Sequence, residues 1–357
     1  MQKDFHYAVT YIVARWADFS HKKAQIIAYA SQLVDDNCDY GTLEFDNGAM
    51  CSQIPSSHKM HDYRNFRTLE QYKVWMPFHF LPGNDGLNFK QDVPGSFINK
   101  LITTSTSHTA NEMVDYCLVN WKAKSPDRLH RLGITLHTLS DCWAHQGFVG
   151  INHEVNDVIL MDGSEFTKPS LFNVIKGGLI DTIGALISKF MSNAFPLGHA
   201  STFDVPDLPY LKWKYINDGA QFVRENYNDY VSAAEAMYGV LKQISPNLSC
   251  KPSLSDEQKD LLKQLFISFK QRNSYDRLNG WMKLLVDDAF DIGSVHLRPY
   301  KKEGLGSWRH DALGNEENPR FTPEFLKSNW KLFHDALFAQ KYTITRLILP
   351  KYGICAA

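Results

Sequence analysis

The chain has 357 residues, of which 44% are hydrophobic and 22% charged, so it has the composition of a folded globular protein rather than of a disordered or collagen-like chain. Its 38 Lys and Arg side chains balance 39 Asp and Glu side chains, and this balance does not support binding to long nucleic acid by bulk charge. Its six cysteines include no C-x-x-C pair, which argues against thiolate zinc sites and a disulfide scaffold.

The first half of the chain is expected to be mainly helical. Helical periodicity predicts a helix over residues 4–19 and a second one through residue 35, with Ser20 as its N-cap. The glycine-containing stretch that follows indicates a loop with a short hairpin at residues 38–55. Further elements are expected in this order: a helix at 68–75 that stops at Pro77, a turn-rich loop at 82–86, and helices at 106–122 and 126–146.

The second half has the same helical character, with longer loops. We expect an amphipathic helix at 171–191, a loop at 196–209, helices at 218–241, 255–271 and 275–286, a long exposed loop at 300–319, and a closing helix at 323–349. The fold class is therefore predicted as all-α, a multi-helix bundle with long loops and little or no sheet. With no repeat and no flexible linker, residues 1–357 are expected to form one mainly helical domain, with a metal-binding core at 1–150 and a helical remainder at 151–357.

Localisation is predicted from two absences. The N-terminus carries Asp4 and His6 where a signal peptide would be apolar, and no run of about 18 apolar residues suggests a membrane span. We therefore expect a protein that is cytoplasmic or secreted by a non-classical route. The apolar positions of 171–190 are compatible with contact to a membrane surface, although packing in the core is the favoured interpretation.

The strongest motif is a polar stripe on the helix predicted at 126–146. His137, Asp141 and His145 follow one another at four-residue spacing and fall on one face of a helix whose other faces are apolar. Buried imidazole and carboxylate groups need partners, and a divalent metal provides one. His145 lies about 12 Å along the helix from His137, so it suits a second ion, with Asp141 between the two. The alternative is a purely structural set of hydrogen bonds.

Other candidate ligands are weaker when taken singly. His6 occurs early in an apolar helix, in the motif D-F-H-Y. Asp35 and Asp36 end a helix, where the helix dipole disfavours acidic side chains and a cation would be favourable. His79 lies among aromatic residues before a turn. Each has an ordinary structural interpretation as well.

Taken together, three motifs resemble a microbial protein family that looks like a remote relative of the zinc-dependent phospholipase C and S1–P1 nuclease superfamily. The motifs are D-F-H-Y, A-Y-A-S-Q-x-V-D-D at 28–36, and L-G-x-x-L-H-x-x-x-D-x-x-x-H-Q-G-F at 132–148. The resemblance implies an all-α fold, up to three zinc ions and hydrolysis of phosphoester bonds. By position it implies these metal ligands: His6, Asp35 or Asp36, His79, His137, Asp141 as the bridging carboxylate, and His145.

The chain also departs from the superfamily. It has H-x3-D-x3-H where the superfamily usually has H-x3-D-x5-H, and it lacks the downstream H-x3-E. The superfamily uses the amine of a processed N-terminal residue as a ligand, which Met1 is not expected to supply. These differences imply a reduced site with one or two metals, or an inactive enzyme.

The expected function is a metal-dependent hydrolase of phosphoester bonds, phospholipase C-like or a related phosphodiesterase. The cofactor is expected to be zinc, one to three ions, although manganese, iron and nickel also fit such ligands. The substrate is expected to be a small phosphoester or a phospholipid. His79, His137, Asp36 and Asp141 would hold the core ion, with Asp36 and Asp141 as the catalytic carboxylates and Asp141 bridging to an ion held with His6 or His145. Phosphate contacts are expected from Lys59, Arg64 or Arg131.

Two alternatives remain open. A phosphohydrolase of the HD type would use an adjacent His-Asp pair such as His61-Asp62 as ligands. A non-catalytic helical protein, for example a binding or toxin-like module, would keep the His137–Asp141 stripe for structural reasons only.

Overall fold

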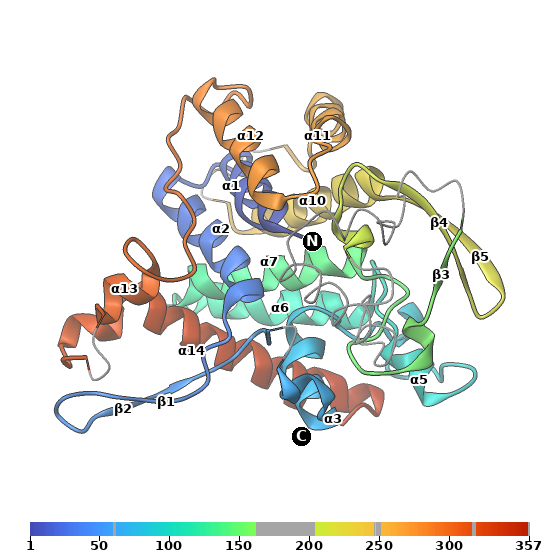
Figure 1. Ribbon diagram of the computed structural model, residues 1–357, viewed down its shortest axis with the longest axis horizontal. Coiled ribbons are helices and arrows are strands. Elements are labelled where there is room, and N and C mark those ends of the chain that lie inside the picture. The colour runs from blue at the N-terminus through green and yellow to red at the C-terminus, as the bar shows by residue number, and fades with distance from the viewer. Residues whose placement is uncertain (60–61, 162–203, 246, 248–250, 316–318, 356–357) are drawn as a thin grey trace, which may run out of the picture.

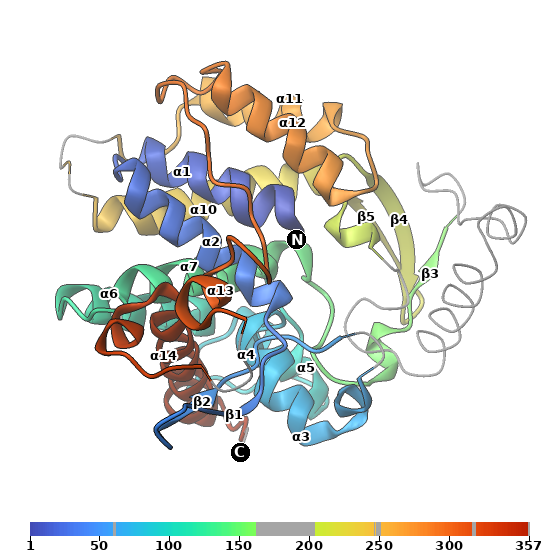
Figure 2. The same ribbon diagram turned by 60° about the vertical axis from the view of Figure 1, so that its left-hand side comes forward.

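The computed structural model describes residues 1–59, 62–161, 204–245, 247, 251–315 and 319–355. The protein is mainly helical, and its helices surround α7 (Arg128–Ala144), which is buried from His130 to Ala144 (Figures 1 and 2). The other α-helices of the described ranges are α1 (Thr10–Trp16), α2 (His21–Asp36), α3 (Thr68–Glu70), α4 (Met76–Phe78), α5 (Phe97–Leu101), α6 (His108–Lys122), α10 (Asn226–Gln243), α11 (Asp256–Ser268), α12 (Ser274–Val286), α13 (Trp308–Leu313) and α14 (Asn329–Tyr342).

Shorter helical turns of the 3-10 and π type connect these helices. The π-helices are η1 (Asp4–Val9), η3 (Gln71–Trp75) and η9 (Thr343–Ile348), and the 3-10 turns are η2 (Tyr63–Phe66), η4 (Asn84–Gly86), η5 (Glu154–Asn156), η7 (Val205–Asp207), η8 (Pro323–Lys327) and η10 (Leu349–Tyr352). The helix predicted at the N-terminus is confirmed, but it begins as a π-helix. π-helical turns occur frequently at functional sites. The candidate ligand His6 lies in η1, and the candidate ligand His79 follows shortly after the end of η3.

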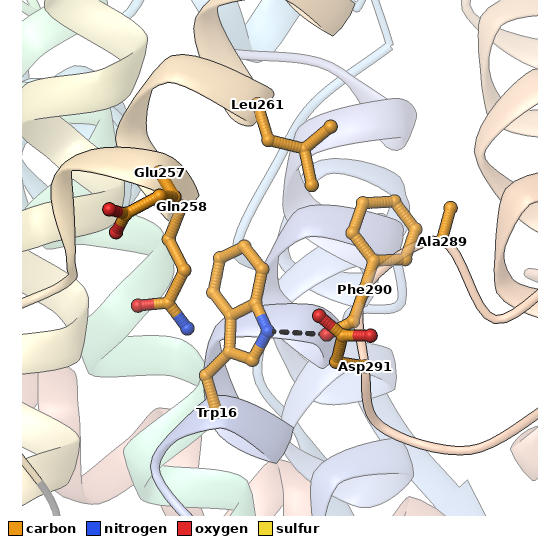
Figure 3. A pocket seen from close by; sticks show the side chains of 7 residues that line it. All are labelled: Trp16, Glu257, Gln258, Leu261, Ala289, Phe290 and Asp291. Carbon is orange, nitrogen blue, oxygen red and sulfur yellow. Dashed lines mark hydrogen bonds between the residues drawn. The ribbon is translucent and has the colours of Figure 1, made fainter.

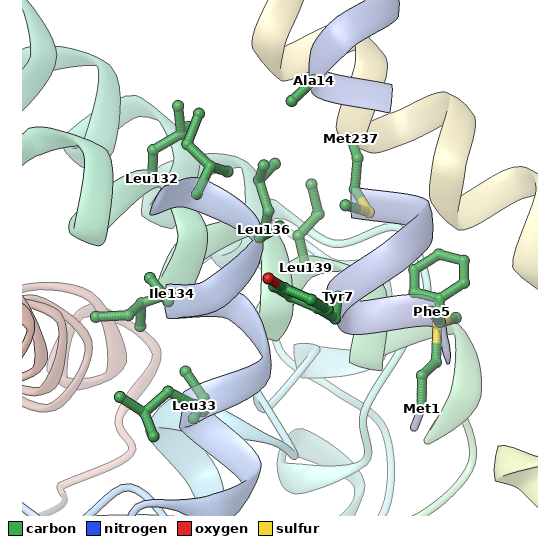
Figure 4. Packing of buried hydrophobic residues seen from close by; sticks show 14 of the residues in the cluster. Met1, Phe5, Tyr7, Ala14, Leu33, Leu132, Ile134, Leu136, Leu139 and Met237 are labelled. Carbon is green, nitrogen blue, oxygen red and sulfur yellow. The ribbon is translucent and has the colours of Figure 1, made fainter. Parts of the chain in front are cut away.

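The hydrophobic core explains why α7 is central. Its apolar side chains Leu132, Leu136 and Leu139 pack with Leu33 of α2 and Tyr7 of η1 (Figure 4). A glycine on the same helix, Gly133, lies so close to α2 that a Cβ added at this position would approach the Ile27 carbonyl oxygen to 2.3 Å. This close approach brings the C-terminal end of α2 to the polar stripe of α7.

The prediction of an all-α fold is confirmed only in part, because the mainly helical described part of the chain also forms two small antiparallel sheets. β1 (Gly41–Glu44) pairs with β2 (Met50–Gln53), as the predicted hairpin suggested, and β3 (Ile159–Leu160), β4 (Lys212–Asn217) and β5 (Ala220–Glu225) form a second sheet in that order. The helix predicted at 218–241 therefore begins only at Asn226. Asp218 and Gly219 have φ of +46° and +74°, as an Asp-Gly hairpin turn requires.

Other predicted boundaries shift by smaller amounts. The helix before Pro77 continues through it to Phe78, because proline is tolerated in the first turn of α4. The predicted loop at 300–319 contains α13, which Ser307 caps through its side chain. The predicted helix at 171–191, and with it the suggested membrane-surface contact, lies outside the described residues. Among the described residues, no helix is both long enough and apolar enough to cross a membrane.

Two buried histidines outside the candidate site predict a pH-dependent stability. Burial lowers the pKa of His130 to about 4 and the pKa of His334 to about 3. The folded protein keeps these imidazoles neutral, whereas histidines of the unfolded chain bind protons below their ordinary pKa of about 6.5. The free energy of unfolding is therefore highest above pH 6.5 and falls as the pH decreases toward 4. The loss should be on the order of 3 kcal/mol for His130.

Urea unfolding between pH 7 and 4, with a chelator present, measures this effect. The variant His334→Asn keeps an acceptor for the Ile54 N–H, which the Nδ1 of His334 binds at 3.0 Å, but cannot titrate. Its stability should fall less steeply with acid than that of the wild type. Equal slopes for the two proteins would contradict the prediction.

Candidate metal centre

Five of the predicted ligands converge around a sixth, the buried carboxylate of Asp141. His6 comes from η1, Asp35 from the last turn of α2, His79 from the C-cap of α4, and His137 and His145 from α7 and its C-cap. The imidazole nitrogens of the four histidines lie 3.2–3.7 Å from the Asp141 oxygens. Segments spread over the first 145 residues therefore meet at one point.

The tightest part of this cluster is a triangle of three donor atoms. His79 Nδ1 and His137 Nε2 are 3.2 Å apart, and they lie 3.3 Å and 3.2 Å from Asp141 Oδ2. Donors at about 2.0–2.1 Å around a tetrahedral zinc ion lie about 3.4 Å from one another, so the triangle has the size of one face of such a site. Asp35 Oδ1, at 3.7 Å from His79 Nδ1 and 3.8 Å from His137 Nε2, is the next donor.

Backbone carbonyls fix the orientation of two imidazoles. His79 Nε2 lies 2.9 Å from the Ser56 carbonyl oxygen, and His145 Nδ1 lies 2.8 Å from the His79 carbonyl oxygen. A carbonyl only accepts, so these nitrogens carry protons, and in a neutral imidazole the opposite nitrogen then presents a lone pair. Metal-bound histidines are commonly held by such a second hydrogen bond. His79 Nδ1, which faces Asp141, is thus ready to act as a ligand.

His6 forms the second side of the cluster. Its ring stacks on His137 with a centroid distance of 3.9 Å, and its Nε2 lies 3.2 Å from Asp141 Oδ1 and 3.9 Å from Asp35 Oδ2. Within the described part of the chain, neither nitrogen of His6 makes a well-oriented hydrogen bond. Burial and the adjacent His137 hold the pKa of His6 well below its ordinary value, so the ring is neutral, as a ligand must be.

The electrostatics of the carboxylates differ. Burial alone would raise the pKa of Asp141, but other effects, the charge of the N-terminal ammonium group foremost, hold it well below its ordinary value. Burial raises the pKa of Asp35, whose side chain is still 26% exposed. Asp141 is therefore the permanently charged centre, and Asp35 is the ligand nearest to solvent.

The amine of Met1 also enters the cluster, contrary to the expectation from the sequence. Its nitrogen lies 2.7 Å from Asp141 Oδ1 and 3.0 Å from Asp207 Oδ1. Burial lowers the pKa of this amine, but the carboxylates of Asp141, Asp207 and Asp35 outweigh burial and raise it to about 11. In this structure a cation therefore lies beside Asp141.

The side chain of Asp36 points away from the histidine cluster, unlike that of its neighbour Asp35. Its carboxylate accepts hydrogen bonds from Lys3 at 3.2 Å, from Gln32 at 2.9 Å and from the Tyr300 hydroxyl at 2.8 Å. Two three-residue groups of the described chain could hold a metal ion, His6–Asp35–His137 and His79–His137–Asp141, and neither includes Asp36. The structure therefore brings Asp35 to the cluster and gives Asp36 a supporting position.

Asp207 was missed by sequence reasoning. It lies in η7, and its Oδ1 is 3.5 Å from His145 Nε2. In the sequence it is one acid in V-P-D-L-P, with no periodic stripe to mark it. The only available signal was an acidic residue held in a proline-bracketed turn.

Asp62, Arg64 and Arg131, which the sequence offered as alternative ligand and phosphate contacts, have other partners in the structure. Asp62 binds Arg64, which holds the pKa of that carboxyl at about 2, while His61 lies outside the described residues. Arg131 is buried and donates to the Thr343 hydroxyl at 3.0 Å, so it does not face an opening.

A surface hollow lies at a different place on the molecule (Figure 3). Its volume is ≈ 180 Å³, and it shares no residue with the cluster around Asp141. It is lined by Trp16, Glu257, Gln258, Leu261, Ala289, Phe290 and Asp291. A hydrogen bond of 2.9 Å from the Trp16 indole to the Phe290 carbonyl ties α1 to the segment after α12, and residues of α11 complete the lining.

Fold and site together define a mainly helical protein with a buried group of histidines and aspartates that could hold a metal ion. The chain belongs to the family described as "Family of unknown function (DUF6765)", whose model matches residues 1–348. No curated protein and no solved structure matches the chain.

Proposed function

We propose that this protein is a metal-dependent hydrolase of phosphoester bonds whose ion is held by His79, His137, Asp141 and Asp35. The observation that carries the proposal is the triangle of His79, His137 and Asp141 donor atoms, with edges of 3.2–3.3 Å. These three buried atoms are all possible metal ligands, and one divalent ion at their centre would bind all three at once.

The donor set favours zinc. Two imidazoles and one or two carboxylates are a common catalytic zinc set, and such sites keep one position open for water or substrate. Manganese, iron and nickel accept the same donors. His137 belongs to both groups that could hold an ion, so it is the residue that the two candidate sites share. A second ion would use Asp141 Oδ1, the oxygen that the Met1 amine contacts in this structure, together with His6 Nε2.

Phosphoester hydrolysis is the reaction class that the motif resemblance implies. A bound divalent ion supplies a nucleophilic water near neutral pH and stabilises charge on phosphoryl oxygens. In this chain His79 and His137 would hold the ion, Asp141 would balance its charge, and Asp35 lies at the solvent side, where a substrate would enter. Small phosphoesters and phospholipids are the proposed substrates, because the near-zero net charge does not favour long nucleic acid.

Removal of the metal tests this proposal. Purified protein should contain at least one equivalent of zinc or another transition metal, and it should hydrolyse bis(p-nitrophenyl) phosphate or a phospholipid. Dialysis against a chelator should abolish hydrolysis, and added zinc should restore it. The measurements are elemental analysis and the rate of product release.

Two outcomes separate the alternatives. A folded protein that stays metal-free after incubation with zinc would support the structural interpretation of the His137–Asp141 stripe. A protein that loses its metal on Asp62→Asn but keeps it on Asp141→Asn would support an HD-type site instead.

A further inference from the structure

The N-terminal segment that carries His6 is held by Arg277, a side chain 273 residues away from Asp4 in the sequence. Arg277 of α12 is fully buried and donates to both oxygens of Asp4, at 2.8 Å and 2.9 Å. The same guanidinium donates to the Gln2 side chain at 2.7 Å. Two carbonyl oxygens of its own chain segment, those of Gln271 and Arg272, accept its remaining donors at 2.6 Å and 2.9 Å.

This arrangement fixes the guanidinium on both sides. The 271–272 carbonyls anchor it to the start of α12, and its fork then meets the Asp4 carboxylate in a bidentate pair, a geometry that lysine cannot reproduce. Asp4 is the first residue of η1, two residues before His6, and the Gln2 carbonyl accepts the backbone N–H of His6 at 2.9 Å. Arg277 therefore holds the residues on which the position of His6 depends.

A second contact supports the same segment. Lys3 donates to Asp36 at 3.2 Å, and Tyr300 donates to the same carboxylate at 2.8 Å. Gln2, Lys3 and Asp4, the three residues that follow Met1, are thus each bound by side chains outside the segment. The π-helical turn is placed by tertiary contacts rather than by its own capping, since the side chain of its N-cap residue, Lys3, makes no capping hydrogen bond.

We propose that Arg277 is a positioning residue for the candidate metal centre, acting through Asp4 and Gln2 to keep His6 against Asp141 and His137. This role rests on the proposed metal function. His6 stacks on His137 and lies 3.2 Å from Asp141, so a displaced η1 would disturb two residues of the donor triangle as well as His6 itself. Residues in the supporting shell of a metal site commonly change metal affinity by about 10–100-fold.

The test compares metal binding in the full-length wild type and in Arg277→Lys and Arg277→Gln. Zinc affinity is measured by competition with a chelator, and cobalt is used as a spectroscopic probe of the coordination geometry. We expect an affinity about 10-fold lower for Arg277→Lys and up to about 100-fold lower for Arg277→Gln, with an altered visible cobalt spectrum in both. If Arg277→Gln does not fold, Arg277→Lys still tests the positioning role, because it keeps the positive charge.

Two controls separate positioning from stability. Arg298→Gln breaks a partly exposed ion pair with Asp311 and should leave affinity and spectrum unchanged. Phe325→Leu reduces packing in a buried aromatic group away from the centre and should lower the melting temperature without changing the cobalt spectrum.

The outcomes are distinct. A wild type that binds metal, with folded Arg277 variants of equal affinity and identical spectra, overturns the positioning role alone. A wild type that binds neither zinc nor cobalt overturns the metal centre, and the positioning role with it.

Discussion

Replacing His137 with alanine is expected to remove the bound metal and the hydrolytic activity together. His137 belongs to both groups that could hold an ion, and its Nε2 lies 3.2 Å from both His79 Nδ1 and Asp141 Oδ2. Loss of a direct ligand should cost more than the roughly 100-fold seen at the upper end for supporting residues. Elemental analysis after gel filtration and the rate of phosphodiester hydrolysis measure the two effects.

His130→Ala is the matched control for this variant. His130 is also a buried histidine of α7, but its Nε2 donates to the Asn329 side chain at 3.0 Å, away from the cluster. Both variants should lose some stability through the cavity that they create. Only His137→Ala should lose metal, and a folded, fully metallated His137→Ala protein would refute the assignment.

The α7 stripe could be predicted because the information is local. Four-residue spacing places His137, Asp141 and His145 on one face of a helix, and an apolar remainder implies that this face is buried. That these residues lie close to His6 and His79 could be predicted only from the motif resemblance. Spacing along the chain contains no measure of how separate segments pack.

The choice between Asp35 and Asp36 shows where local information ends. Adjacent residues on a helix point about 100° apart, so only one of the two carboxylates can face α7. Lys3 and Tyr300 bind Asp36, and Asp35 therefore faces the histidines. Tyr300 lies 264 residues from Asp36 in the sequence, so no local pattern could indicate this contact. Asp207 was missed for the same reason, since it meets His145 only through tertiary packing.

The second sheet was missed for a different reason. The strand Ala220–Glu225 is short and runs directly into α10, so its apolar residues resemble the start of that helix. The Asp218-Gly219 pair was the available local signal, because this dipeptide favours a tight hairpin between two strands. Periodicity alone does not distinguish a short strand from the first turns of a helix.

Gly133→Ala is expected to destabilise the fold, because it separates two helices, α2 and α7, that carry candidate metal ligands. A Cβ at this position would lie 2.3 Å from the Ile27 carbonyl oxygen and 2.8 Å from the Ala30 Cβ. The nearest obstacle is backbone, so relief requires movement of α2 relative to α7. Overpacking of this kind costs about 1–3 kcal/mol or more, against a gain of at most about 1 kcal/mol in helix propensity.

The same movement should reach the metal centre. Asp35 ends α2, and His137 lies one turn beyond Gly133 on α7, so a shift between the helices lengthens the 3.8 Å separation of Asp35 Oδ1 from His137 Nε2. Gly133→Ala should therefore lower the denaturation midpoint of the metal-free protein and weaken zinc binding as well.

Gly239→Ala in α10 is the control for this change. A Cβ there meets nothing within 4 Å, so the same substitution in a helix interior should raise stability by about 0.5–1 kcal/mol and leave metal affinity unchanged. The comparison isolates the contact between α2 and α7 from the general effect of replacing glycine in a helix. If Gly133→Ala also proved stabilising, with unchanged zinc affinity, close packing of these two helices could not be what sets the position of Asp35.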